Sequence, residues 1–304
     1  MNKGFQVGWW LIVITIGVIF GASFGAAFSG INFEGQYLPS IMLESGVLIP
    51  ILIGILYGKK HVIGIRDMLA VERFPIKILP VVLLLTLGAQ YFITYITLPV
   101  QSILVVMFGA ETNTSQMIAP KNLIEFLQAF AALCIVAPLI EEFLCRGVLM
   151  KLFERYGAAV AIVSSSLAFT LLHFEARSFL QIFFVGALFG VFRLYTGSVF
   201  VTVLMHSFNN LLSLLQIILM ENNRFSTLAV IIIILAFLFP FILYLTLTKG
   251  RKYFGYVNMT SEKTGFSVGA LICAIMFFGY NLILFLTRLV NGDCLREIYN
   301  LIGW

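Results

Sequence analysis

Three ionisable side chains lie close together in an otherwise apolar segment, APLIEEFLCRG at 137–147. Residues four apart share one face of a helix, so Glu142 and Arg146 are expected to pair. Glu141 lies about 100° around the helix and is left without that cation. A carboxylate without a cationic partner in apolar surroundings is suited to take a proton from water as a general base. The segment therefore predicts a salt bridge that supports a site and a second carboxylate that does chemistry. The structural alternative is a buried salt-bridge cluster between helices, which would not need the second carboxylate.

Two of the three histidines also lie in apolar segments. FTLLH places Phe169 one helical turn before His173, so that the ring packs against the imidazole, and HSFNN places His206 one turn before Asn210. Either histidine alone is typical of a hydrogen-bonded interior residue, and the phenylalanine alone of a core. Counted along their helices at about 1.5 Å per residue, the two histidines, Asn210 and Glu141 fall at similar depth. We therefore expect these four polar side chains to meet in one layer of a membrane.

Two histidines, a glutamate and an asparagine at one depth suit the hydrolysis of a peptide bond. A water molecule between Glu141 and His173 would be deprotonated to attack a carbonyl, and His206 and Asn210 would donate hydrogen bonds to the oxyanion that develops. The alternative is a zinc site with Glu141, His173 and His206 as ligands and a bound water in the fourth position. The chain has no HExxH sequence, and an asparagine suits carbonyl polarisation better than metal binding. The cofactor stays open between a divalent metal such as zinc and none.

Membrane-spanning helices must position these residues. The chain has 304 residues, of which 61% are hydrophobic and 11% charged, and its mean hydropathy is +1.03. A soluble domain of this size cannot bury so much apolar side chain, whereas a spanning helix needs about 20 mostly apolar residues. We predict an all-α fold, a polytopic membrane helical bundle of eight to nine transmembrane helices. It forms a single integral membrane domain over 1–304 with a motif-bearing core at about 122–220. The predicted spans are 8–29, 38–58, 78–107, 122–150, 158–174, 178–195, 198–220, 227–248 and 267–290.

The lysine and arginine residues predict the orientation of these spans. Most of those outside the spans, including Lys59, Lys60 and Lys77, fall on the side that also contains the N-terminus. Cytoplasmic loops carry the excess of basic residues, so the N-terminus is expected to be cytoplasmic and the site to be accessible from that side. The net charge of +5 is spread along the chain and forms no basic patch, which argues against a nucleic-acid partner. The four cysteines include no CxxC pair, so neither a disulfide framework nor a thiolate zinc site is supported.

The three motifs together resemble those of a known family. EEFLCR, FTLLH and HSFNN, in this order on separate predicted helices, are similar to the EExxxR, FxxxH and HxxxN motifs of the CAAX protease and bacteriocin-processing (CPBP) family. These are intramembrane endopeptidases and include the type II CAAX prenyl endopeptidases. The resemblance covers about 137–210. It implies that Glu141 activates water with His173 as its partner, that His206 and Asn210 form the oxyanion or second polar pair, and that Glu142 and Arg146 support the site.

The resemblance also implies a bacterial cell-membrane location and two kinds of partner, membrane lipid and a membrane-associated peptide or protein substrate. The family has been described both as metalloproteases and as metal-free glutamate-dependent enzymes, so metal dependence stays open, as do the substrate, its prenylation and the oligomeric state. Two other functions compete with proteolysis. One is a non-catalytic membrane peptide-binding or bacteriocin-immunity protein, which would tolerate loss of the glutamate. The other is a proton-coupled transporter, for which the repeated halves expected of such proteins are not found in the sequence.

Overall fold

The computed structural model describes residues 78–108, 120–173, 178–221, 238–239 and 242–243. This part of the chain is all-helical, and four of its helices are long and apolar enough to cross a membrane: Leu79–Gln101, Leu123–Phe153, Phe179–Thr196 and Val199–Leu219. They coincide with four of the predicted spans. The predicted spans 8–29, 38–58 and 267–290, and most of 227–248, lie outside the described residues. The all-α class is therefore confirmed for the described part, and a total of eight to nine spans stays a prediction.

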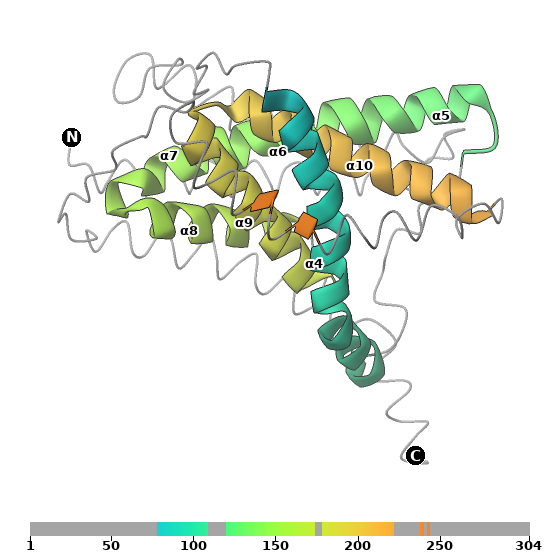
Figure 1. The fold of residues 1–304 in the computed structure, drawn as a ribbon, viewed down its shortest axis with the longest axis horizontal. Coiled ribbons are helices and arrows are strands. Elements are labelled where there is room, and N and C mark those ends of the chain that lie inside the picture. The colour runs from blue at the N-terminus through green and yellow to red at the C-terminus, as the bar shows by residue number, and fades with distance from the viewer. Residues whose placement is uncertain (1–77, 109–119, 174–177, 222–237, 240–241, 244–304) are drawn as a thin grey trace, which may run out of the picture.

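The described helices form one bundle with two projecting ends (Figure 1). α7, α8 and α9 gather on one side of the picture, α5 and the end of α10 extend to the other, and α4 crosses between them. The most extensive packing is between α8 and α9, and α10 contacts α4, α6 and α9. The elements are α4 (Leu79–Phe108), α5 (Leu123–Ala129), the π-helix η2 (Phe130–Val136), α6 (Ala137–Glu142), the π-helix η3 (Phe143–Leu149), α7 (Met150–Phe153), the 3₁₀ turn η4 (Glu154–Tyr156), α8 (Ala158–Leu172), α9 (Phe179–Thr196) and α10 (Val199–Glu221).

The long helix that carries Glu141 begins with a reciprocal cap. Asn122 Oδ1 accepts a hydrogen bond from the Glu125 N–H at 2.9 Å, and the Glu125 carboxylate accepts from Asn122 Nδ2 at 2.8 Å and from the Lys121 N–H at 2.9 Å. Such a capping box satisfies backbone donors that the first turn of a helix leaves free. The position of Glu125 is thus explained by the start of α5.

Two π-helical segments, η2 and η3, flank the short helix α6. Pro138 leaves one carbonyl of η2 without a backbone donor, and a side chain supplies the missing hydrogen bond. In the i to i−5 ladder of η2 the Ala137 N–H bonds to the Ala132 carbonyl. The next carbonyl, that of Leu133, faces Pro138, which has no N–H to donate. Asn210 Nδ2 of α10 donates to this carbonyl at 2.8 Å. Pro138 therefore follows a change of helix type that a side chain from another helix supports.

Helix α8 is shorter than the four candidate membrane spans. Its 15 residues end at Leu172, and at about 1.5 Å per residue they span about 22 Å, less than the roughly 30 Å of a hydrocarbon core. Residues 174–177 lie outside the described part of the chain, so a full crossing at 158–174 stays a prediction. The consequence for the site is direct, because His173 follows the last helical residue and lies at the C-terminal end of α8.

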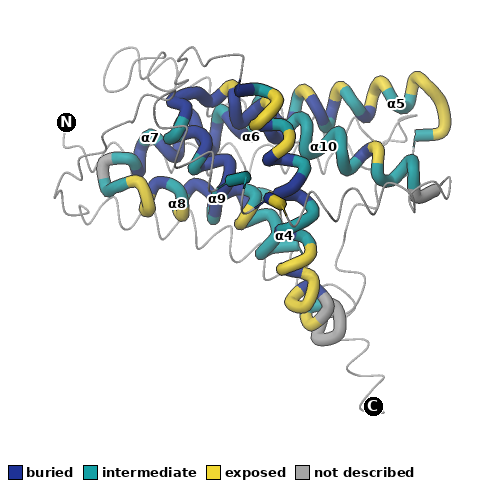
Figure 2. The backbone as a smooth tube through the Cα atoms, viewed as in Figure 1, coloured by how far each residue is buried: buried dark blue, intermediate teal, exposed yellow. Residues whose placement is uncertain are grey.

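One face of α4 is buried and the other is exposed (Figure 2). The buried side chains include polar ones, Thr86, Gln90, Thr97 and Gln101, as well as apolar ones such as Val82 and Leu85, whereas Tyr95, Ile96 and Ile103 are exposed. The apolar side chains on the exposed face suit a helix that faces lipid on its outer side.

Candidate functional site

At the centre of the bundle lies a fully buried ion pair. Arg146 Nη1 bonds to Glu142 Oε1 at 2.9 Å, and both side chains have 0% exposure. The pair predicted from the four-residue spacing is therefore present. Arg146 Nη2 also donates to the Gly186 carbonyl of α9 at 2.9 Å, and its guanidinium lies over the Phe169 ring, 4.3 Å from the centroid. The arginine thus connects the helix of the two glutamates to α8 and α9.

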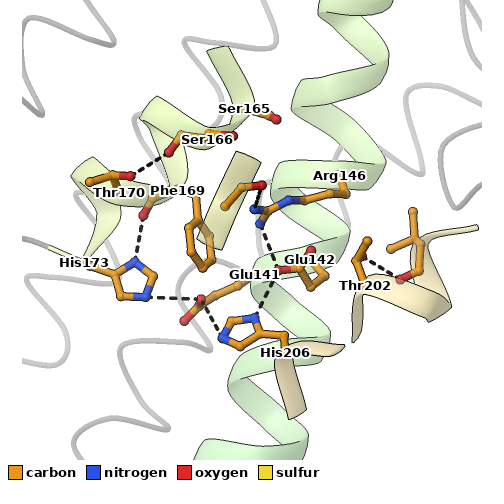
Figure 3. Close-up of polar contacts among 12 residues, drawn as sticks. Glu141, Glu142, Arg146, Ser165, Ser166, Phe169, Thr170, His173, Thr202 and His206 are labelled. Atoms are coloured by element: carbon orange, nitrogen blue, oxygen red, sulfur yellow. Dashed lines mark hydrogen bonds and ion pairs between the residues drawn. The ribbon is translucent and has the colours of Figure 1, made fainter. Parts of the chain in front are cut away.

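Glu141, His173 and His206 come together from three separate helices (Figure 3). Glu141 Oε2 lies 3.7 Å from His173 Nε2 and 3.8 Å from His206 Nε2. This oxygen is buried and has no hydrogen-bond partner among the described residues. Of the four side chains expected to meet, these three lie close together, and the bond of Asn210 is to the Leu133 carbonyl. The atom at the centre of the three is an acceptor without a donor among the described residues.

The hydrogen-bond partners of the two Nδ1 atoms determine the tautomers of His173 and His206. His173 Nδ1 is 2.7 Å from the Phe169 carbonyl, which can only accept, so this nitrogen carries a hydrogen and donates it. His206 Nδ1 is 3.0 Å from Glu142 Oε1 and donates to it. In their neutral forms both histidines therefore present an unprotonated Nε2 to Glu141. Three acceptor atoms face one another, which is an arrangement that calls for a shared hydrogen donor such as water or an added proton.

The described residues of the cluster carry an excess of negative charge. With both imidazoles neutral, Glu141 and Glu142 carry two negative charges against the single positive charge of Arg146. An unbalanced buried charge is costly in apolar surroundings. Glu142 Oε1, 3.0 Å from His206 Nδ1, would stabilise an imidazolium that forms at His206 during a reaction.

Aromatic rings restrict the motion of both histidines. The ring of Phe169 lies 4.5 Å from that of His173, as the spacing predicted, and 5.5 Å from that of His206. The ring of Phe189, in α9, lies 5.6 Å from that of His206. Phe169 therefore contacts both imidazoles and also the guanidinium of Arg146.

The exposure of the side chains differs across the site. The side chain of His173 is 30% exposed and that of Glu141 17%, whereas His206 is 5% exposed. The cluster is therefore most exposed on the side of His173, at the end of α8, and the ion pair of Glu142 and Arg146 lies fully buried behind it.

Gly186 belongs to the site and was missed by reasoning from the sequence. A Cβ at this position would lie 3.2 Å from Arg146 Nη2 and 3.2 Å from Phe169 Cδ1, so a larger residue would press on the guanidinium and the ring. The signal was present as GALFG, in which Gly186 and Gly190 are four apart in an apolar helix, because this spacing permits close helix contact. At Gly190 the corresponding nearest atom is Ile162 Cγ2 at 3.4 Å.

Asn210 contributes through the neighbouring helix. It lies one turn after His206 on α10, and one of its amide hydrogens is used by the Leu133 carbonyl. The second amide hydrogen and Oδ1 remain for other partners. Ser165 and Ser166, by contrast, are buried and donate to the Ile162 carbonyl of their own helix, which suits close packing between helices.

The donor atoms at the centre are of the kinds that zinc binds. Two imidazole nitrogens and one carboxylate oxygen correspond to the three protein ligands of many catalytic zinc sites. Among the residues that the structure describes, however, no group of three or more histidine, cysteine, aspartate or glutamate side chains is arranged to hold a metal ion.

The fold and this site define a class: an integral membrane protein of apolar helices with a largely buried glutamate and histidine cluster. A comparison with known families makes the assignment more specific. Residues 123–212 match the model of the type II CAAX prenyl endopeptidase Rce1-like family, which confirms the resemblance seen in the three motifs. The match runs from the start of α5 into α10 and includes all the residues proposed for the site. The chain therefore carries an Rce1-like segment, and this family implies a peptidase. No curated protein sequence and no solved structure matches the chain.

Proposed function

We propose that the protein is an intramembrane endopeptidase that hydrolyses a peptide bond in a membrane-associated peptide or protein. The observation that carries the proposal is Glu141 Oε2, a buried acceptor without a donor that faces two imidazole nitrogens. A water molecule bound there donates one hydrogen to the carboxylate and one to His173 Nε2, which leaves an oxygen lone pair free for attack. The Rce1-like match supports the same class of reaction.

The chemical steps use the residues in named roles. The water oxygen attacks the substrate carbonyl carbon while Glu141 takes the water proton. The carbonyl π electrons move to its oxygen, and the protonated His206 Nε2 and the remaining amide hydrogen of Asn210 stabilise this oxyanion. The proton held by Glu141 then passes to the amide nitrogen as the C–N bond breaks, and the products are a carboxylic acid and an amine. Glu142 and Arg146 act as positioning residues because they hold His206.

The site is proposed to be reached from the cytoplasm, in a bacterial cell membrane, because most basic residues outside the spans fall on that side. Membrane lipid is the expected surrounding, and a CAAX-type sequence is the first substrate to try, because the matching family is described by that activity. Reporter fusions at the N-terminus test the orientation independently of activity.

The experiment uses purified protein in lipid vesicles and an internally quenched peptide that ends in cysteine, two aliphatic residues and a variable residue. The peptide is supplied both farnesylated and unmodified. Glu141→Gln and His173→Ala are expected to lower turnover at least about 100-fold, since general acid–base groups contribute about 10² to 10⁴, and both variants should remain in the membrane. Glu125→Gln is the matched control, because it makes the same substitution in the same long helix at the exposed cap.

Each outcome distinguishes between functions. Normal cleavage by Glu141→Gln shows that the proposed base is wrong. Tight peptide binding without turnover by the wild-type protein supports the non-catalytic peptide-binding alternative. If neither probe is cleaved, comparing membrane-associated peptides from cells with wild-type or Glu141→Gln protein identifies or excludes a natural substrate. Metal analysis of active protein, with a chelator control, separates a metal-dependent from a glutamate-type mechanism.

A further inference from the structure

The polar face of α4 has no role in the chemistry described so far. Its members follow one another at spacings of three or four residues, which places them on one side of the helix: Thr86, Gln90, Thr94, Thr97 and Gln101. This side faces α9 and α10. A row of buried polar groups in a membrane-spanning helix needs either internal partners or a ligand.

Most of the row has internal partners. The hydroxyls of Thr86, Thr94 and Thr97 donate to carbonyls one turn earlier in α4. Gln101 Nε2 donates to Gln181 Oε1 of α9 at 2.9 Å, and Gln181 Nε2 donates to Thr94 Oγ1 at 2.9 Å. Polar contacts of this kind hold membrane helices together, so this part of the row is explained by packing.

Gln90 differs from the other members. Its side chain donates from Nε2 to Ser213 Oγ of α10 at 3.0 Å. The single hydroxyl hydrogen of Ser213 goes to the Asn209 carbonyl at 3.2 Å, so Ser213 accepts from Gln90 and the orientation of the amide is determined. Gln90 Oε1 is then the free end. It is buried, has no hydrogen-bond partner among the described residues, and belongs to a residue that is only 7% exposed.

The free oxygen lies near the proposed site. Ser213 follows His206 by seven residues, which is two turns on the same face of α10 and about 10.5 Å along its axis. Ala89, the neighbour of Gln90, belongs to the same core cluster as Phe189, whose ring is 5.6 Å from that of His206. An extended peptide advances about 3.3 Å per residue, so this distance corresponds to about three residues of substrate.

We propose that Gln90 Oε1 accepts a hydrogen bond from a backbone N–H of an extended peptide substrate, about three residues from the bond that is cleaved. This rests on the proposed function and makes Gln90 a positioning residue of the same site. An extended peptide in apolar surroundings has backbone N–H groups that need an acceptor, and an unpaired amide oxygen supplies one. Recognition of the backbone would position substrates without selecting their side chains.

The test measures binding in the absence of turnover. The unmodified and farnesylated probe peptides are made as a series in which one backbone N–H at a time is replaced by N–CH₃. The series covers up to four residues on the amino side of the cleaved bond and every residue on its carboxyl side. Binding to Glu141→Gln protein is compared with binding to Glu141→Gln carrying Gln90→Met. The matched control carries Gln101→Met, because Gln101 lies on the same face and its amide nitrogen is already paired with Gln181.

N-methylation at one position of the series is expected to weaken binding about threefold to tenfold, the value of one hydrogen bond. This loss is expected in the Glu141→Gln protein and in the Gln101→Met control, because both keep Gln90. The same position should cost nothing extra after Gln90→Met. A purely structural role for Gln90 would lower binding of every peptide equally, and that result refutes the inference, as does a failure of either probe to bind. Cleavage by the protein with an intact Glu141 is measured separately. A refuted role for Gln90 therefore does not refute the proposed peptidase function.

Discussion

Replacing Arg146 with methionine removes the charge that balances Glu142 at the centre of the bundle. The substitution loses the hydrogen bonds to Glu142 Oε1 and to the Gly186 carbonyl, both 2.9 Å long, and the contact with the Phe169 ring. It leaves a carboxylate with 0% exposure and His206 as its remaining partner. Breaking a buried ion pair on one side costs about 3–5 kcal/mol. The unfolding equilibrium should therefore shift by about two to nearly four orders of magnitude.

The assay is equilibrium unfolding in mixed micelles, together with the yield of folded protein. Lys151→Met is the matched control, because Lys151 bonds to Glu154 at 2.7 Å but its side chain is 33% exposed. The pair is partly buried, but Glu154 keeps Arg193 Nη2 at 3.2 Å as a second cation, so this variant should lose much less stability than Arg146→Met.

A second variant separates the charge from the shape. In Glu142→Gln/Arg146→Met the unbalanced charge is gone, and the glutamine oxygen still accepts from His206 Nδ1. The double variant should lose less than half of the free energy that Arg146→Met loses. A cost below about 1 kcal/mol for Arg146→Met, or a double variant as unstable as the single one, would refute the reasoning that an unbalanced buried carboxylate dominates.

Two further predictions follow from single contacts. Gly186→Ala places a Cβ 3.2 Å from Arg146 Nη2 and Phe169 Cδ1 and should destabilise by about 1–3 kcal/mol with a loss of turnover. Gly190→Ala, whose nearest atom is Ile162 Cγ2 at 3.4 Å, should cost less in the same unfolding assay, and equal costs would contradict the close approach at Gly186. Asn210→Ala removes the donor to the Leu133 carbonyl and should cost about 1–3 kcal/mol. Adding Pro138→Ala restores an N–H for that carbonyl and should recover part of the loss; no recovery would show that proline does not create the need for Asn210.

Spacing within a single helix made several of these contacts predictable. The pair of Glu142 and Arg146 and the packing of Phe169 on His173 both follow from residues four apart, because a helix brings such residues together wherever it lies. The meeting of Glu141 with the two histidines was expected from depth alone. The depth of a residue along its helix can predict such a meeting because a bilayer aligns the helices that cross it.

Other features could not be read from spacing. The predicted span 158–174 did not indicate that α8 ends at Leu172, so that His173 lies at the end of the helix and not within it. The sequence also gave no reason to connect Pro138 with Asn210, which lie on different helices and meet through the Leu133 carbonyl. The catalytic roles of Glu141, His173, His206 and Asn210 stay proposals until activity is measured.

By itself, the sequence determined that the chain is a helical membrane protein and which polar residues are out of place in it. Apolar content and segment length are sufficient for the first, and the high cost of ionised groups in apolar surroundings is sufficient for the second. Only the tertiary structure decided that Glu142 supports both Arg146 and His206, that Gly186 makes room for the guanidinium, and that Gln90 keeps a free oxygen. The physical reason is that these depend on which faces of separate helices meet, and two π-helical segments shift those faces away from what a regular helix would present.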